Sequence, residues 1–257
     1  MSPPPTVPLE RALSKLGAAS RTQARALIEA GRVRVDGATI HDPQRPVTPE
    51  TARIDVDGRP VTQAPLRIVA FHKPRGCLTT RSDPRGRPTI YDWLPPSLDL
   101  MPVGRLDQAT SGLLLLTNDT RLATWLTDPA SGVERVYVAT VRGLVTDDEA
   151  AALRSVEDAG ERLGADAVVL KRSRRESRLR LTLTEGRNRE VRRLTLTIGH
   201  EVTRLLRVSY GGLALGDLAA GAWRDVSLPE TLAAFPTLPP ALVRRMGARL
   251  VPPGRTG

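Results

Sequence analysis

The chain has 257 residues, enough for one or two domains with a buried core. Its 38 lysines and arginines, 35 of them arginine, exceed 28 acidic residues and give a net charge of +10 and a pI near 10.9, so a polyanionic partner is expected. No apolar run approaches the ~18 residues that span a bilayer, and there is no signal-peptide core, so a cytoplasmic protein with no membrane partner is expected.

Metal and cofactor chemistry have little support in the sequence. The single cysteine, Cys77, excludes an internal disulfide, and His41, His72 and His200 have no metal-ligand spacing with it. There is also no glycine-rich nucleotide-binding loop. We therefore expect neither a metal nor a small-molecule cofactor.

The N-terminal part of the chain predicts a small helical module. Residues 1–6 are rich in proline and are expected to be disordered. Apolar residues at helical spacing predict helices over 9–16 and 21–30, the second introduced by the cap-like Ser20. Residues 32–37 alternate basic and apolar side chains, which is typical of a half-buried strand that ends in an Asp-Gly turn.

Two segments of this module resemble the S4 RNA-binding domain: Ala19-Ser-Arg21 and Ile28-Glu-Ala-Gly-Arg-Val-Arg-Val-Asp-Gly37. The resemblance covers nearly all of residues 7–56 and implies a module that grips structured RNA without doing chemistry. It makes four arginines candidate phosphate contacts: Arg21, Arg25, Arg32 and Arg34. A solvated charged face on an ordinary helical module is the alternative interpretation.

A change of domain is indicated by five prolines between residues 41 and 66, and we expect a linker over residues 57–65. The second domain is expected over residues 66–240. Its first turn, Lys73-Pro-Arg-Gly76, makes Lys73 a candidate RNA contact. Residues 241–257 are expected to form a basic tail, to which no role is assigned.

The stretch from Val103 to Asp119 is the most informative part of the second domain. Asp107 lies beside Arg105 in a turn, just before the apolar run Leu113–Leu116, which is typical of a strand buried on both faces. A carboxylate at the mouth of such a strand is held rigidly and shielded from water, which favours a catalytic role. A turn cap, or a pair with Arg105, is the plainer interpretation, because turns favour aspartate.

A second motif, Glu185-Gly-Arg-Asn-Arg-Glu-Val-Arg-Arg-Leu194, places four arginines within seven residues. They would repel one another unless anions lie nearby, and Asp107 is one such anion. Between the two motifs, a predicted strand contains Tyr137, one of three tyrosines in the chain. A core tyrosine with a satisfied hydroxyl is the alternative to a binding role for it.

The first motif closely resembles the centre of the pseudouridine synthases of the RsuA/RluB type, which act on ribosomal RNA, in these residues: Gly104-Arg-Leu-Asp107, Thr110, Gly112, the leucine run and Thr117-Asn-Asp119. The second motif, with Arg204-Leu-Leu-Arg-Val-Ser-Tyr-Gly-Gly212, looks closest to the large-subunit synthase B branch. Thr120 departs from the glycine that the family usually has. The resemblance implies an α+β fold, with an S4 module followed by a catalytic domain on a mixed, mostly antiparallel sheet.

The resemblance also implies roles for the site residues. Asp107 would be the catalytic carboxylate, which either attacks C1′ of a uridine or removes a proton from C2′. Arg192 would pair with it and favour its ionised form. Tyr137 would stack on the flipped uracil, and Arg105 would fill the space that the base leaves. The other arginines of the second motif become substrate or RNA contacts: Arg187, Arg189 and Arg193.

The expected function is isomerisation of uridine to pseudouridine in ribosomal RNA by a monomeric enzyme. Large-subunit (23S) RNA is favoured only by the wording of the second motif, so small-subunit (16S) RNA stays an alternative. A non-catalytic RNA-binding or ribosome-assembly factor also explains the charge, but it does not explain Asp107 together with Arg105 and Arg192. A hydrolase with a carboxylate pair would need a second acid near the first, and none is clear.

Overall fold

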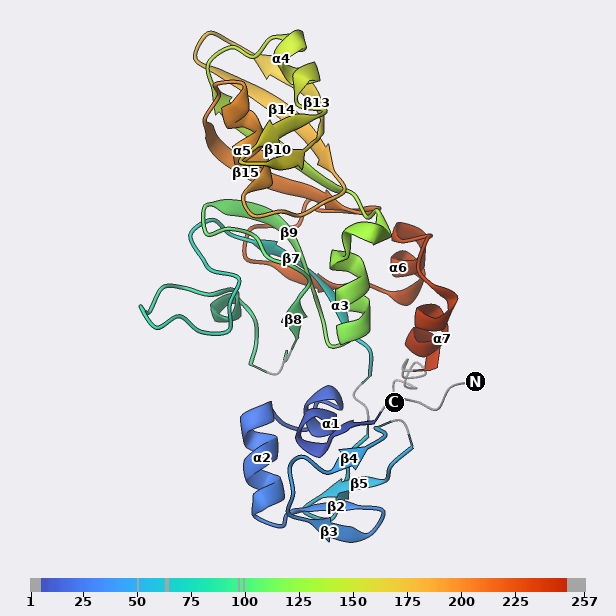
Figure 1. Cartoon of the computed structure of the whole chain (residues 1–257). Helices are drawn as coiled ribbons and strands as arrows, with labels where there is room; N and C mark the ends of the chain where they lie inside the picture. The colour runs from blue at the N-terminus through green and yellow to red at the C-terminus, as the bar shows by residue number, and fades with distance from the viewer. Residues whose placement is uncertain (1–5, 50, 63–64, 97, 99, 249–257) are drawn as a thin grey trace. The chain divides into compact units, whose positions relative to one another are not determined.

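The computed structural model describes residues 6–49, 51–62, 65–96, 98 and 100–248 (Figure 1). The chain divides into two units, a small one of residues 1–66 with 248–257 and a large one of residues 67–247. The expected disorder over residues 1–6 falls, except for Thr6, outside the described residues. Residues 249–257 of the expected tail also lie outside them.

The small unit packs two helices and a four-stranded antiparallel sheet around one core that includes Leu13 and Ile28. Both helices lie where the sequence predicts them, and α2 begins at a capping box in which Ser20 and Gln23 bond each other's backbone N–H. Its elements are α1 (Leu9–Lys15), α2 (Arg21–Glu29), the sheet β3 (Ala38–Ile40), β2 (Val33–Val35), β5 (Ile54–Val56) and β6 (Arg59–Pro60), and the pair β1 (Val7–Pro8) and β4 (Pro46–Val47).

The expected linker over residues 57–65 is corrected by β6, which pairs with β5 and extends the small sheet to Pro60. Asp57 and Gly58 both have positive φ, 51° and 74°, and join the two strands in a tight hairpin. Asp36 and Gly37 do the same between β2 and β3, with φ of 51° and 88°. The Asp-Gly pair at residues 36 and 37 correctly predicts a turn, whereas the prolines near residues 57 and 58 obscure the same signal there.

The large unit is built on a nine-stranded sheet of order β13-β14-β10-β15-β9-β7-β17, with β16 beside β15 and β8 beside β9. Within the described strands, β15 and β9 pair in parallel and all other pairs are antiparallel, so the predicted mixed, mostly antiparallel sheet is confirmed. The strands are β7 (Ile68–Lys73), β8 (Met101–Pro102), β9 (Thr110–Thr117), β10 (Arg135–Arg142), β13 (Asp166–Arg172), β14 (Glu176–Leu183), β15 (Val202–Tyr210), β16 (Leu213–Ala214) and β17 (Trp223–Asp225).

Helices and a short hairpin complete the large unit. They are α3 (Thr120–Thr127), α4 (Asp147–Ala152), α5 (Glu190–Thr197), α6 (Leu228–Ala234), α7 (Pro240–Ala248), the 3₁₀ turns Ile90–Trp93 and Pro129–Ser131, and the hairpin of β11 (Val156–Asp158) and β12 (Glu161–Leu163). The expected basic tail therefore begins as a helix. Met246 of α7 is buried, and Arg245 Nε donates to Asp119 Oδ2 at 3.1 Å, so the ordered domain continues beyond residue 240.

Strand β9 fixes the centre of the large unit. Leu113 to Leu116 are fully buried, which confirms the prediction of a strand covered on both faces. Gly112 has φ of +115°, and a Cβ there would lie 2.3 Å from the carbonyl oxygen of Arg207. Only glycine therefore lets β15 run so close to β9. This contact places Arg207 beside the turn that carries Asp107.

Candidate active site

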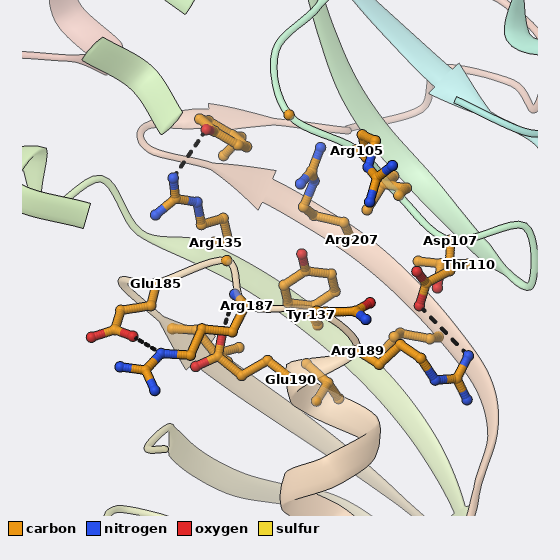
Figure 2. Close-up of a pocket in the computed structure, with 18 of the residues that line it drawn as sticks. Arg105, Asp107, Thr110, Arg135, Tyr137, Glu185, Arg187, Arg189, Glu190 and Arg207 are labelled. Carbon is orange, nitrogen blue, oxygen red and sulfur yellow. Dashed lines mark hydrogen bonds and ion pairs between the residues drawn. The ribbon is translucent and has the colours of Figure 1, made fainter. Parts of the chain in front are cut away.

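A pocket of about 330 Å³ opens in the large unit, between the turn before β9, strands β10 and β15, and the segment that leads into α5 (Figure 2). Its volume is typical of a site for a small ligand or for one residue of a polymer. Five residues predicted from the sequence line it: Arg105, Asp107, Tyr137, Arg187 and Arg189. Residues 103–110 and 183–191 are far apart in the chain, and the sheet brings them together.

The backbone around Asp107 is held by a buried cation. Lys73 is fully buried, and its Nζ donates to the carbonyl oxygens of Thr110 (2.9 Å), Pro74 (3.1 Å) and Asp107 (3.2 Å). Burial lowers the pKa of this lysine. On the other side of the turn, Thr79 exchanges two hydrogen bonds with the backbone of Leu106. Lys73 was predicted to contact RNA, and its burial corrects that: it holds the turn.

The carboxylate of Asp107 faces the pocket, with about a third of its side chain exposed. Its nearest cation is Arg189, whose Nη1 lies 4.0 Å from Oδ2, as the dashed line in Figure 2 marks. Arg189 has a left-handed backbone (φ 52°) immediately before α5. This conformation, at the point where the helix begins, sets the direction of the side chain.

Arg192, the predicted partner of Asp107, has other contacts. Its Nη1 donates to Val202 O at 3.1 Å and its Nη2 to Ala109 O at 3.5 Å, so the side chain ties α5 to β15 and to the turn before β9. It does not line the pocket. The resemblance implies that Arg192 pairs with Asp107, but within the described structure the ion pair of Asp107 is with Arg189, and Arg192 donates to backbone carbonyls instead.

The rest of the second motif is held by acidic side chains. Arg187 pairs with Glu185, and its backbone N donates to Glu190 Oε2 at 3.0 Å. Glu190 is buried, and desolvation raises its pKa. Arg193 pairs with two acids of the β11–β12 hairpin, Asp158 and Glu161. The guanidinium of Arg193 thus holds the hairpin to α5, and its predicted contact with RNA stays a prediction.

Sequence reasoning missed the buried polar side chains of the pocket. Arg135 and Arg207 are 4% and 3% exposed, and their guanidinium groups lie 5.1 Å and 4.9 Å from the ring centre of Tyr210. The hydroxyl of Thr110 is also buried against the pocket. Arg135 is two residues from Tyr137, so strand alternation places both on one face. That two-residue spacing from Tyr137 was the one signal in the sequence that Arg135 belongs to the pocket.

The four arginines predicted to contact RNA in the small unit are all exposed. Arg25 Nε donates to Glu10 at 2.9 Å, and Arg32 forms a two-bond pair with Asp57 at 2.8 and 2.6 Å. Arg34 points outward from β2, and Arg21 lies in the first turn of α2. Two of the four therefore already hold a carboxylate.

Among the described residues, no three or more His, Cys, Asp or Glu side chains form a group that could hold a metal ion. None of the described helices is long and apolar enough to span a bilayer.

The chain matches known families over both units. A model of the RNA pseudouridylate synthase family matches residues 67–197, and a model of the S4 domain matches residues 7–52. A solved structure described as a pseudouridylate synthase superposes with a TM-score of 0.63 at 26% identity, covering 87% of this chain and 97% of that chain.

Curated relatives agree. The ribosomal large subunit pseudouridine synthase B of Salmonella typhimurium is 38% identical over 90% of this chain and 84% of that protein. The protein of the same name from Escherichia coli K12 is 40% identical over 87% and 80%. An uncharacterized RNA pseudouridine synthase of Mycobacterium bovis is 40% identical over 88% and 92%. The chain therefore belongs to the RNA pseudouridine synthase family of isomerases, with an S4 domain at its N-terminal end.

Proposed function

We propose that this enzyme isomerises one uridine of large-subunit (23S) ribosomal RNA, with Asp107 as its catalytic carboxylate. The relatives named large subunit pseudouridine synthase B support the choice of RNA. The net charge of +10 and the S4 domain suit a large polyanionic substrate. A ribosomal substrate also implies that the enzyme works as a cytoplasmic protein.

The observation that carries the proposal is the setting of Asp107: a carboxylate exposed to a pocket, on a turn held by Lys73, with an arginine 4.0 Å away. The reaction breaks the bond between C1′ and N1, turns the uracil, and rejoins it through C5. Asp107 would attack C1′ or take a proton from C2′, and either step uses the ionised carboxylate. Arg189, whose Nη1 lies 4.0 Å from Oδ2 of Asp107, would help to hold the carboxylate in place.

The target uracil must leave the RNA stack to reach Asp107, at a cost of a few kcal/mol. Tyr137, half-buried on β10, would stack on the uracil inside the pocket. Arg105 is exposed at the pocket rim and would fill the space that the base leaves. Contacts of the exposed small-unit arginines with phosphates would offset the cost of flipping.

Pseudouridine mapping on ribosomal RNA tests the proposal. Carbodiimide modification and primer extension would compare cells that have the gene, cells that lack it, and deleted cells that carry Asp107→Asn. We expect one stop in 23S RNA to vanish in the deletion and to stay absent with the variant. Loss of a 16S stop would move the substrate to the small subunit, whereas no change at any stop would favour a binding factor.

A further inference from the structure

Two buried polar atoms of the pocket have no hydrogen-bond partner in the part of the chain that the structure describes. They are Nη2 of Arg207 and Oγ1 of Thr110, on residues that are 3% and 2% exposed. Both residues line the pocket that contains Asp107. Buried polar groups in proteins are nearly always paired, so an unpaired guanidinium nitrogen on a residue that lines the pocket favours a ligand that pairs with this arginine.

Among the described residues, Arg207 has no counter-ion, and its Nη2 has no hydrogen-bond partner. Its Nε donates to the carbonyl oxygen of Leu113 at 2.7 Å, and its guanidinium lies over the ring of Tyr210, but no described carboxylate forms an ion pair with it. The pocket lining contains five arginines and three carboxylates, and two of those carboxylates are taken by Arg187 and Arg189. A buried cation bound only to neutral groups is costly, and an anion removes that cost.

We propose that Arg207 forms a subsite for a phosphodiester that flanks the target uridine. A phosphate oxygen supplies both the missing acceptor and the missing negative charge, and the guanidinium fork suits its geometry. A uracil carbonyl would supply only the acceptor. In the view of Figure 2, Arg207 lies between Arg135 and Arg105. Asp107 and Thr110 lie together at the right of the same view. One nucleotide would thus present its sugar to Asp107 and a phosphate to Arg207. This inference rests on the proposed function.

Arg135 provides a matched control, because it is as deeply buried and lies over the same tyrosine ring. Its guanidinium, however, is occupied by the protein. Nη1 donates to Val133 O and Thr184 O, and Nη2 donates to Leu126 O and to the hydroxyl of Tyr210. We therefore assign Arg135 to holding the pocket wall.

The test uses the full-length enzyme and a synthetic RNA stem-loop that carries the uridine found by mapping. Three RNAs are compared: an unmodified one, and two with a single neutral methylphosphonate on the 5′ or 3′ side of that uridine. With wild-type enzyme, we expect one of the two replacements to lower kcat/KM by about 10- to 100-fold, the size of one charge-assisted hydrogen bond. With Arg207→Gln, the unmodified RNA should lose a similar factor, and the neutral linkage should lower it by less than about 3-fold more.

Arg207→Lys should restore part of both the rate and the sensitivity to the neutral linkage, because the charge is retained. Arg135→Gln should show the same fall in kcat/KM on the methylphosphonate RNA as wild-type enzyme does, even if its rate on the unmodified RNA is lower. Wild-type enzyme that is indifferent to both methylphosphonates would overturn the subsite, and this arm needs no variant to fold. Full sensitivity retained in Arg207→Gln would assign the phosphate to another residue. The proposed function fails separately and earlier, if mapping finds no stop in ribosomal RNA that depends on the gene.

Discussion

The cations of the small unit and those around the pocket are held in different ways. On the small unit, Arg25 and Arg32 lie at the surface and pair with carboxylates. Around the pocket, Lys73, Arg135 and Arg207 are buried and donate mainly to backbone carbonyls. Surface pairs are worth at most about 1 kcal/mol and exchange readily for a phosphate, whereas buried cations fix the backbone around them.

This difference separates binding from positioning. Surface arginines should set RNA affinity and its dependence on salt, because they can leave a carboxylate for a phosphate. Buried cations should set turnover, because they determine where the turn of Asp107 lies. Substitution of a surface arginine should therefore change RNA affinity, and substitution of a buried cation should change turnover.

The largest effect should come from Lys73→Met, which leaves the carbonyl oxygens of Pro74, Asp107 and Thr110 without their donor. We expect turnover to fall by about 100-fold as Asp107 loses its position, and the free energy of unfolding to fall by about 2–3 kcal/mol. Single-turnover rates and urea unfolding measure the two. Lys171→Met, at an exposed position of β13, is the control and should unfold like wild type. Normal turnover in Lys73→Met would remove the positioning role.

Substitution of Arg189 or Arg192, two arginines of the second motif, should give the next largest effect. Arg189→Gln removes the nearest cation to Asp107 and should lower turnover by about 10-fold, with little loss of stability. Arg192→Gln should instead lower the free energy of unfolding by about 1–2 kcal/mol, because it removes bonds between α5 and its neighbours. The same two assays decide between them. The opposite ranking would return the partner role to Arg192.

A smaller effect is expected at the surface. Arg21→Gln should reduce the slope of log affinity against log salt by about one, if this exposed arginine contacts one phosphate. Arg32→Gln should reduce it less, since Arg32 must first give up Asp57. Fluorescence anisotropy across a salt series measures both slopes. Turnover at saturating RNA should stay near wild type in each variant, and a large loss there would contradict the separation.

The smallest effect concerns Glu190, whose pKa is raised by burial. Below its ordinary value of 4.5 the side chain is protonated in both the folded and the unfolded state, and its contribution to stability is fully present. As pH rises through the raised pKa, the unfolded state loses its proton first, and stability falls. The wild-type free energy of unfolding should therefore decline from pH 4.5 upward relative to Glu190→Gln, as followed by urea unfolding. A constant difference across that range would show that burial does not affect this carboxyl.

Much of the fold could be predicted from local patterns. The two helices of the small unit have a clear apolar period and the leucine strand is an unbroken apolar run, and the structure contains all three elements. Strand β6 was missed because prolines received more weight than the turn at Asp57 and Gly58. Helix α7 was missed because its basic residues resemble a solvated tail, whereas Met246 and Arg245 dock it on the large unit.

The site was harder to predict residue by residue. Asp107, Arg105 and Tyr137 all line the pocket, as expected. These three could be named in advance because each lies in a recognisable motif of the sequence. The orientation of an arginine depends on where α5 begins, and composition does not show whether residue 189 or residue 192 faces the pocket. Arg207 looks like any other strand arginine in the sequence, yet it is 3% exposed in the folded chain. Burial depends on contacts between distant segments, which local patterns do not contain.

Release of the C5 hydrogen from uridine tests the central claim most directly, because the new bond to C5 must displace it. RNA labelled with tritium at C5 of uridine would be incubated with purified wild-type enzyme and with Asp107→Asn at equal RNA occupancy. We predict release of one tritium per target uridine with wild type, none with the variant, and RNA affinity within about 2-fold of wild type, since the substitution leaves the arginines proposed to contact phosphates unchanged. Release by Asp107→Asn at a comparable rate would contradict the assignment of Asp107 as the catalytic carboxylate.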